Sequence, residues 1–413
     1  MPRAIRFPEV VETHRMRVFE TFTVHFQRAA KEVAQLDGNA SLASVYVARS
    51  TWDRWMAGDI KGLPRPTTCR VLEHLFGEPA EQLFGPLEPE ATPTAATAGS
   101  GSMSPHLAAM ESFRLADRQL GGGHVYRSVV HYLKTVIAPA LFSAADNGED
   151  SEITFGAAVV LTEMAAWMAH DAGRDDLASG HFDRARRLSQ SLTDVTAGAN
   201  VMAGMSHLAL QTDQVDTAAD LARSGLARLA DGPQVPTLTA RLHAMEARAL
   251  AQLNTEPEAQ RALETAREAL ALARTEPTSR WVAPFDEAAL ASEAASALLD
   301  LGALKAAAKE AKHALALRDA SRVRSRAFGQ VTLARILLAQ GHPDAACSVG
   351  TELLNASQSV TSLRLSRQLA LLQADFGPYQ QIPEVRELLL RMTSTAQHRK
   401  LLLGSLALPE GPQ

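Results

Sequence analysis

The chain of 413 residues is long enough for two or three domains, and it combines 46% hydrophobic with 21% charged residues. An apolar fraction of this size excludes a fully disordered chain, because the apolar side chains would drive collapse. Aromatic residues make up only 5%, whereas the helix formers Ala and Leu dominate, so we expect an all-α protein rather than a β-sandwich. The net charge of −5 gives the whole chain no signature of nucleic-acid or membrane binding.

The cysteine content and the hydropathy pattern predict the cellular setting. The two cysteines, Cys69 and Cys347, are too few for a disulfide framework and fit a reducing compartment. The first residues lack the apolar core of a signal peptide, and no apolar run approaches the ~18–20 residues of a membrane span. We therefore expect a soluble, cytoplasmic protein with no membrane partner.

A stretch rich in Pro, Thr, Ala, Gly and Ser over residues 87–105 interrupts the helical pattern. It has no spaced large apolar residues, so burial cannot offset the entropy lost on ordering it. We predict a flexible linker there, between a smaller domain over residues 1–86 and a larger one over residues 106–413.

The first domain shows five helical segments in order. A long amphipathic helix is predicted over residues 12–36, because large apolar residues recur along one stripe. Asp37-Gly38-Asn39 ends it, and a short helix over 40–46 follows. The next helix begins near Ser50 as its N-cap and ends at Gly58, which suits a left-handed cap. Two further helices are expected over residues 67–76 and 79–84.

The segment VARSTWDRWMAG at residues 47–58 combines a buried face with a polar one. Trp52 and Trp55 are three residues apart, so they share one face and are expected to anchor the core. The residues around them project from the other side, where Arg can bind guanine and Ser or Thr can reach bases or phosphates. The basic residues after Gly58 suit phosphate contact. The DNA-binding residues that we predict are Arg49, Ser50, Thr51, Arg54, Lys61, Arg65 and Arg70.

This segment resembles the second half of a helix-turn-helix of the phage-repressor (XRE) type, and the resemblance extends over about residues 15–85. The chain departs from that family in the preceding helix. Gly38, Leu42 and Tyr46 stand where the family has Gln, Ala and Gly, which implies a shortened or distorted first helix. Residues 1–88 carry eleven basic and eleven acidic residues, and residues 49–70 carry five basic against two acidic ones. A solvated helix face would explain that local excess equally well.

The second domain repeats itself. Five turn positions can be aligned, at spacings of 40, 41, 48 and 39 residues: Gly173, Asp213, Asn254, Gly302 and Gly341. A small residue stands seven positions before each turn, an apolar one four before, and an alanine five after. Small residues at fixed places let the two helices of a hairpin approach closely, and stacked hairpins bury a continuous core. We also expect one degenerate hairpin over residues 110–143 and another over residues 360–395.

The pattern resembles the tetratricopeptide (TPR) repeat with lengthened helices. The predicted fold is therefore an all-α chain with an N-terminal helix-turn-helix domain joined by a linker to a TPR-like α-solenoid. In TPR proteins the groove is lined by positions thirteen, ten, six and three before the turn. Transferred to this chain, those positions predict a ligand groove formed by Glu163, Trp167, His170, Asn200, His207, Arg241, Arg248, Ser292, Ser296, Phe328 and Arg335. Val331 falls on the same face. Arginine can bind a carboxylate bidentately and asparagine can pair with a peptide backbone, although an ordinary solvated face would also be polar.

Other patterns do not indicate catalysis. Acidic residues and histidines between His170 and Asp183 have no metal-ligand spacing and suit helix capping. The glycines over residues 121–123 follow no strand, so a hairpin turn is expected rather than a phosphate loop. The arginines between Arg318 and Arg326 open a helix, where a solvated face is favoured over a second phosphate contact. Without a nucleophile elbow, paired-carboxylate motif or nucleotide fingerprint, we expect no enzyme activity, metal or cofactor.

A helix-turn-helix joined to a TPR array resembles the RRNPP quorum-sensing regulators and similar actinobacterial transcriptional regulators. The resemblance implies a homodimer on a double-stranded DNA operator, with a peptide or small signal molecule in the groove. The alternative is a TPR protein-interaction scaffold whose helix-turn-helix no longer binds DNA, which the neutral charge of residues 1–88 favours.

Overall fold

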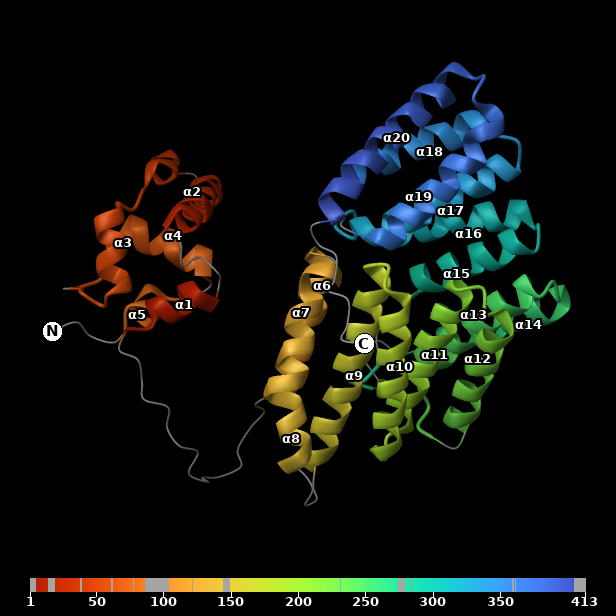
Figure 1. Cartoon of the computed structure of the whole chain (residues 1–413), viewed down its shortest axis with the longest axis horizontal. Coiled ribbons are helices and arrows are strands. Elements are labelled where there is room, and N and C mark those ends of the chain that lie inside the picture. Colours follow the sequence, from red (N-terminus) through yellow and green to blue (C-terminus); the bar gives the residue numbers. More distant parts are fainter. Residues whose placement is uncertain are drawn as a thin grey trace. The chain divides into compact units, whose positions relative to one another are not determined.

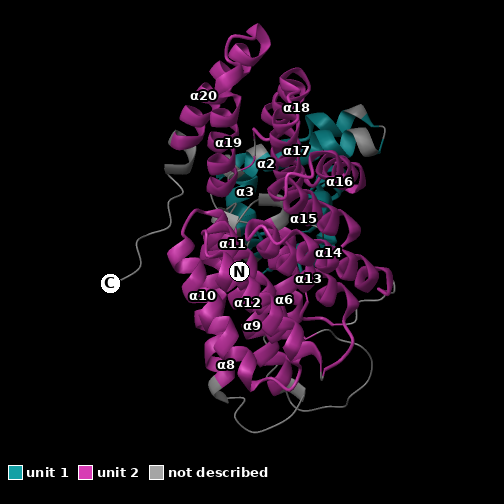
Figure 2. Ribbon diagram, turned by 90° about the vertical axis from the view of Figure 1, so that its right-hand side faces the viewer, with its two compact units in different colours: residues 1–100 teal, residues 101–413 magenta. Residues whose placement is uncertain are grey.

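The computed structural model describes the chain as two compact units, residues 1–100 and residues 101–413 (Figures 1 and 2). The residues described are 5–13, 19–37, 39–60, 62–76, 78–85, 104–120, 122–143, 149–230, 232–273, 279–282, 284–358, 360 and 362–404. Most of the predicted linker lies outside them. We call the first unit the head and the second the array.

Short helices build the head. They are α1 (Phe7–Thr13), α2 (Phe19–Leu36), the 3-10 helix η1 (Ala40–Ser44), α3 (Arg49–Met56), α4 (Pro66–Phe76) and α5 (Ala80–Leu83). The predicted helix over 12–36 corresponds to α2 within the described residues, and residues 14–18 of that prediction lie outside them. The helix before α3 is a five-residue 3-10 helix, as the departures from the XRE pattern imply. Gly58 has a φ of +68°, which fits the predicted left-handed cap.

Phe7 is the centre of the head's core. Its ring packs against those of Trp52 and Trp55 at centroid distances of 5.7 and 5.4 Å, and it stacks on Phe84 at 5.0 Å. Phe7 is fully buried, so α1 contributes a side chain that the rest of the head encloses. The sequence pattern did not predict α1.

The array consists of antiparallel helical hairpins. Its helices are α6 (Pro105–Leu120), α7 (Gly122–Tyr132), the π-helix η2 (Leu133–Ile137), α8 (Ala138–Ser143), α9 (Glu149–Asp171), α10 (Asp175–Leu188), the 3-10 helix η3 (Ser189–Ser191), α11 (Val195–Gln211), α12 (Val215–Ala230), α13 (Pro236–Gln252), α14 (Glu256–Ala271), α15 (Glu287–Asp300), α16 (Leu304–Leu317), α17 (Val323–Ala339), α18 (Pro343–Ala356), α19 (Leu363–Phe376), the 3-10 helix η4 (Gly377–Tyr379) and α20 (Pro383–Gly404). The five aligned repeats are the pairs α9–α10, α11–α12, α13–α14, α15–α16 and α17–α18, and these form a TPR-like α-solenoid (Figure 1).

The five aligned turn positions share a left-handed backbone. Gly173, Gly302 and Gly341 have φ values of 74°, 71° and 76°, while Asp213 and Asn254 have 58° and 59°. Only Gly adopts this region freely, and Asp and Asn tolerate it better than other residues. The alignment is therefore confirmed at the backbone, because each hairpin reverses at the same place.

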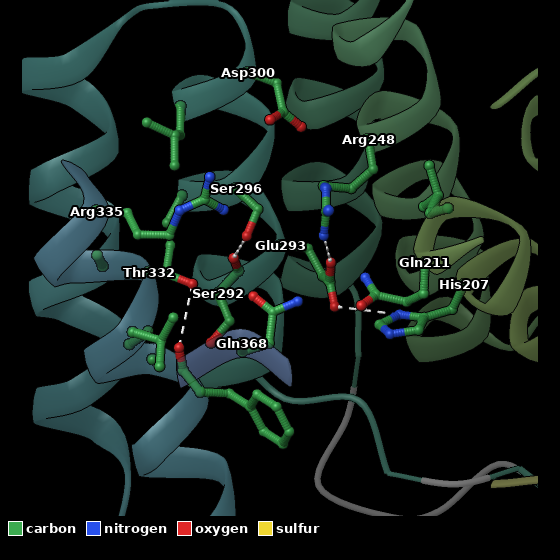
Figure 3. A pocket seen from close by; sticks show the side chains of 18 of the residues that line it. His207, Gln211, Arg248, Ser292, Glu293, Ser296, Asp300, Thr332, Arg335 and Gln368 are labelled. Atoms are coloured by element: carbon green, nitrogen blue, oxygen red, sulfur yellow. Dashed lines mark hydrogen bonds and ion pairs between the residues drawn. The ribbon is translucent and has the colours of Figure 1, made fainter. Parts of the chain in front are cut away.

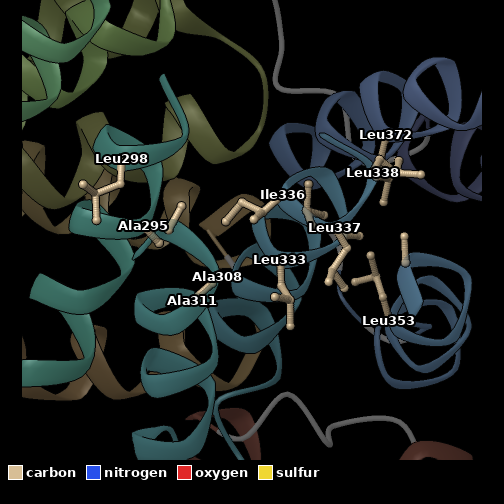
Figure 4. Packing of buried hydrophobic residues seen from close by; sticks show 14 of the residues in the cluster. Ala295, Leu298, Ala308, Ala311, Leu333, Ile336, Leu337, Leu338, Leu353 and Leu372 are labelled. Atoms are coloured by element: carbon tan, nitrogen blue, oxygen red, sulfur yellow. The ribbon is translucent and has the colours of Figure 1, made fainter. Parts of the chain in front are cut away.

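The small residues of the repeat form the contacts between helices. Those seven positions before the turns are fully buried: Ala166, Ser206, Ala247, Ala295 and Ala334. Ala295 and Leu298 of α15 belong to the same core cluster as Leu333 and Leu337 of α17 (Figure 4). A side chain at Gly225 would place its Cβ 2.5 Å from the Leu242 side chain, so a larger residue there would force Leu242 to shift where α12 packs against α13.

Helix α9 is the first helix of the first aligned repeat. Its segment Ser151–Asp171 is apolar and long enough to cross a membrane, but most of that stretch is buried inside the array. Trp281, in the loop between α14 and α15, packs against Gly156 of α9 within the same core cluster. The composition of α9 is thus explained by its position in the core of a helical array.

Candidate functional site

The first helices of the repeats carry the predicted ligand residues, and the structure separates these residues into two groups. The first group is a buried polar network across α9, α11 and α13. Asn200 donates from Nδ2 to Oε2 of Glu163 at 2.6 Å, and Arg241 donates from Nη1 to Oδ1 of Asn200 at 2.6 Å. Trp167 donates from Nε1 to Glu163 at 3.4 Å.

These contacts satisfy the hydrogen-bonding groups that they join. Glu163 and Asn200 are almost completely buried, and burial raises the pKa of Glu163, an effect that the nearby charge of Arg241 opposes. A buried carboxylate needs such partners, because an unpaired one would cost several kcal/mol. The network therefore holds three helices together. His170 is also buried and bonded, through Nδ1, to Asp175 at 2.7 Å.

The second group lines an open pocket of about 490 Å³ (Figure 3). It contains six of the predicted ligand residues: His207, Arg248, Ser292, Ser296, Phe328 and Arg335. The pocket lies along α11, α13, α15, α17 and α19, with one side closed by α16. Its volume is in the range of small-molecule sites, roughly 300 to 1,000 Å³.

Hydroxyl and amide groups form much of the pocket wall. Ser292 and Thr332 each donate to a carbonyl of their own helix, at 2.8 and 3.2 Å, which leaves their oxygens as acceptors. Gln368 comes from α19 and lies among them (Figure 3). Asp300 lies at one end, where burial raises its pKa.

An acidic residue of α15 joins two predicted ligand residues. Glu293 accepts from Nη1 of Arg248 at 2.7 Å and lies 3.8 Å from Nδ1 of His207. The His207 ring also packs edge-on against Trp167, at 5.1 Å between centroids. Burial and the positive charge of Arg364 hold the pKa of His207 well below its usual range, so this imidazole is neutral at physiological pH.

Two arginines that the sequence did not predict as ligand residues also line the pocket. Arg318, at the end of α16, donates to Ser292 Oγ and to a backbone carbonyl, both at 3.3 Å. Arg364 of α19 lies over the Phe328 ring, 4.1 Å from its centroid. Arg364 belongs to the degenerate last hairpin, which has no aligned turn from which groove positions could be counted. Only the packing of α19 against α17 in the folded array identifies it as a pocket residue.

In the arginine-rich segment before and within α17, Arg322 is exposed, whereas Arg324 and Arg326 are held by hydrogen bonds. Arg324 donates to Asp117 of α6 at 2.8 Å and to Asp171 of α9 at 3.1 Å, and Ser362 donates to Asp171 at 2.8 Å. Arg326 donates to two backbone carbonyls at 2.9 Å. The favoured interpretation of a solvated face is therefore wrong for Arg324, because acidic partners more than 150 positions away bind it in the folded array. We call Asp117, Asp171, Arg324 and Ser362 the clasp.

In the head, α3 has the two faces that its sequence predicts. Trp52 and Trp55 are buried, whereas Ser50 and Arg54 are exposed. Arg49 lies over the Phe19 ring at 5.4 Å. The N-cap is Ala48 and not Ser50, so Ser50 lies inside the helix with its side chain exposed.

A groove of about 740 Å³ runs beside α3, lined among others by Thr51, Arg54 and Arg65. Lys61 lies outside the described residues. Arg70 forms a two-bonded ion pair with Asp37, at 2.7 and 2.9 Å, and so joins α4 to the end of α2. The structure thus brings Thr51, Arg54 and Arg65 together, and it holds Arg70 in a separate contact.

Comparisons with known proteins give only distant likenesses. No family model matches the chain, and no curated protein matches it. Among solved structures, BtubC (BKLC) from P. vanneervenii is 16% identical over 55% of this chain and 90% of its own, with a TM-score of 0.39. A Rap protein complexed with Competence and Sporulation Factor is 12% identical over 74% and 100%, with a TM-score of 0.44. Aspartyl phosphate phosphatase F from Bacillus subtilis is 12% identical over 77% and 100%, with a TM-score of 0.39. These likenesses assign the chain to no family.

The described residues contain no group of three or more His, Cys, Asp or Glu side chains placed to hold a metal ion. His181, which the sequence groups with His170, accepts or donates a bond with the Tyr126 hydroxyl at 2.9 Å. The chemistry that the pocket offers is recognition by charge and hydrogen bonds.

Proposed function

We propose that this protein is a ligand-responsive, DNA-binding transcriptional regulator that acts in the cytoplasm as a homodimer. One observation carries the DNA-binding part: α3 buries Trp52 and Trp55 while it exposes Ser50 and Arg54 beside a groove. A helix that is fixed on the core by one face and polar on the other can enter the major groove of DNA.

The residues of the head divide by role in this proposal. Arg49, Ser50, Thr51 and Arg54 would face the base edges, where arginine binds guanine bidentately. Arg65, and Lys61 four positions before it in the sequence, would contact phosphates. Arg70 would contact a phosphate only in exchange for its ion pair with Asp37.

The pocket supports the ligand-responsive part. A ligand changes DNA binding only if it binds one dimer geometry better than another. The clasp supplies a connection for that coupling, because Arg324 lies on α17, which also lines the pocket. Asp117 lies on α6, the first helix after the predicted linker. A ligand that moves α17 would therefore change the ion pair between Arg324 and Asp117, and with it the attachment of α6, the array helix that follows the linker in sequence.

The alternative function is a protein-interaction scaffold whose head does not bind DNA. Two observations favour it: residues 1–88 carry equal numbers of acidic and basic residues, and the Asp37 ion pair engages Arg70. In this case the concave face would bind a protein partner, and the head would serve as a second interaction module.

The proposal is tested by selecting bound sequences from random double-stranded DNA with the full-length protein. We expect an enriched two-fold motif, and we expect Arg54→Ala to weaken binding by about 5- to 100-fold, as the loss of one base contact does. Arg28→Ala, which changes an exposed arginine on α2 outside the groove, is the matched control and should bind normally. Sedimentation of the free protein should give twice the mass of the chain.

Two results would contradict the proposal. The first is the absence of any enriched sequence at low salt, which would leave the scaffold as the remaining function. The second is an equal effect of Arg54→Ala and Arg28→Ala, which would show that α3 does not read DNA.

A further inference from the structure

Three arginines of the pocket, Arg248, Arg318 and Arg364, differ in their acidic neighbours. Glu293 binds Arg248 directly at 2.7 Å. The charge of Glu293 acts on Arg318 less than that of Asp286 does, and on Arg364 less than that of Asp171 does. Among the described residues, no carboxylate lies within ion-pair distance of Arg318 or Arg364. Of these three guanidinium groups, only that of Arg248 has a bound carboxylate within the described residues, so Arg318 and Arg364 line the pocket without a direct ion pair.

The same three arginines have unused hydrogen-bond donors. The Nε–H groups of Arg248, Arg318 and Arg364 are each buried without a hydrogen-bond partner. Arg248 is only 9% exposed, so water does not solvate this donor from outside. A buried unpaired donor costs about 1 to 3 kcal/mol, and more when it is charged. These unpaired donors show that the three guanidinium groups are not fully compensated by their protein neighbours.

Arg364 has the geometry to bind a planar anion. Its guanidinium carbon lies over the Phe328 ring, 4.1 Å from the ring centroid, so the aromatic ring holds this group in the pocket. A guanidinium group can bind a carboxylate or phosphate bidentately through its N–H edge. The neutral ring of His207 lies in the same pocket and can donate a further hydrogen bond.

The remaining pocket wall limits the rest of the ligand. Ser292, Ser296, Thr332 and Gln368 offer hydroxyl and amide groups, and the volume of about 490 Å³ fits a small molecule. We propose that the pocket binds a small, polar molecule through a carboxylate or phosphate group, which Arg364, Arg248 and Arg318 hold beside Glu293. The inference deepens the proposed function, because it names the chemical class of the ligand in the same pocket.

The test measures anion binding to the full-length protein without DNA, by calorimetry and thermal unfolding at constant ionic strength. The probes are succinate, inorganic phosphate, and trialanine as the free acid and as the C-terminal amide. At least one of succinate, phosphate and the acid peptide should raise Tm to a plateau, and by more than potassium chloride does at the same ionic strength. A ligand that binds the folded state stabilises that state. The probe that binds most tightly distinguishes a free carboxylate, a phosphate and a peptide terminus, and the amide should bind at least 10-fold more weakly than the acid.

Variants connect the binding to the arginines. Arg364→Gln should weaken the best probe by at least 10-fold, and Arg364→Lys should weaken it less, because it keeps the charge but loses the bidentate edge. Arg223→Gln is the matched control on α12, where Arg223 pairs with Glu246 outside the pocket, and it should bind like the unaltered protein.

The proposal is overturned if no probe raises Tm above the potassium chloride control, or if Arg364→Gln and Arg223→Gln bind alike. Circular dichroism of each variant separates lost binding from lost folding, and Arg364→Lys keeps the test decisive if Arg364→Gln unfolds. Failure here leaves DNA selection by the head unaffected, so the two proposals fail separately.

Discussion

Replacing Arg324 by alanine should loosen the array at the clasp. Arg324 bridges Asp117 and Asp171, which lie 207 and 153 positions away, so the change removes the shared cation of α6 and α9. Asp171 is only 7% exposed and would keep the single bond from Ser362. The two carboxylates would then repel each other in a site that water reaches poorly.

The magnitude follows from the burial of the partners. Removing one member of a buried ion pair costs about 3 to 5 kcal/mol. The side chains of Arg324 and Asp117 remain 26% and 24% exposed, so solvent screens part of the interaction. We therefore expect a loss of about 2 to 3 kcal/mol. At roughly 2 °C per kcal/mol for a domain of this size, Tm should fall by roughly 4 to 6 °C.

Scanning calorimetry measures the loss, and hydrogen exchange of α6 locates it. Arg322→Ala is the matched control, because Arg322 is exposed just before α17 and should tolerate the change. In a double-mutant cycle, Asp117→Ala should cost much less in the Arg324→Ala background than alone. Equal Tm values for Arg324→Ala and Arg322→Ala, or unchanged exchange of α6, would refute the clasp as a stabilising contact.

Three further predictions concern buried residues. Burial, and to a lesser degree the charge of Arg184, lower the pKa of His181 from 6.5 to about 4. The folded protein therefore holds this imidazole neutral, and the free energy of unfolding is unaffected by its protonation above pH 6.5 but falls as the pH drops from 6.5 towards 4. Unfolding titrations should show up to roughly 3 kcal/mol of acid sensitivity that His181→Gln reduces. Phe7→Ala should cost about 3 to 5 kcal/mol, seen as lost hydrogen-exchange protection in the head, whereas a change confined to α1 would contradict its central role. Gly156→Ala places a Cβ 2.5 Å from the Trp281 ring and should cost about 1 to 3 kcal/mol in chemical denaturation, which an unchanged midpoint would disprove.

Much of the array could be predicted because the constraints on its turn and packing residues are local in the sequence. A left-handed turn restricts the residue at that position, which is why Gly173 and Asn254 could be aligned without any structure. Close helix packing restricts side-chain size in the same way, and Ala247 and Ala334 are fully buried as the repeat predicts. Both constraints act on residues of one hairpin, so they can be recognised in the sequence of that hairpin alone.

The clasp and α1 could not be predicted, because their partners are distant or their segments short. Nothing near Arg324 in the sequence indicates Asp117, and an arginine-rich helix start looks solvated until the array is folded. Helix α1 spans seven residues, too few for a helical period to stand out. The burial of Phe7 depends on rings from α3 and beyond, which only the folded head brings together.

The concave face shows why position alone does not identify a ligand residue. Glu163 and Glu293 both face the groove side, yet their surroundings differ in the count of donors and acceptors. The carboxylate of Glu163 is matched by Asn200 and Trp167, so that group is complete. Glu293 is one acceptor among three guanidinium groups, of which Arg364 makes no ion pair within the described part of the chain. Since Arg364 has no bound carboxylate among the described residues, an acidic group of the ligand is the partner that we propose for it.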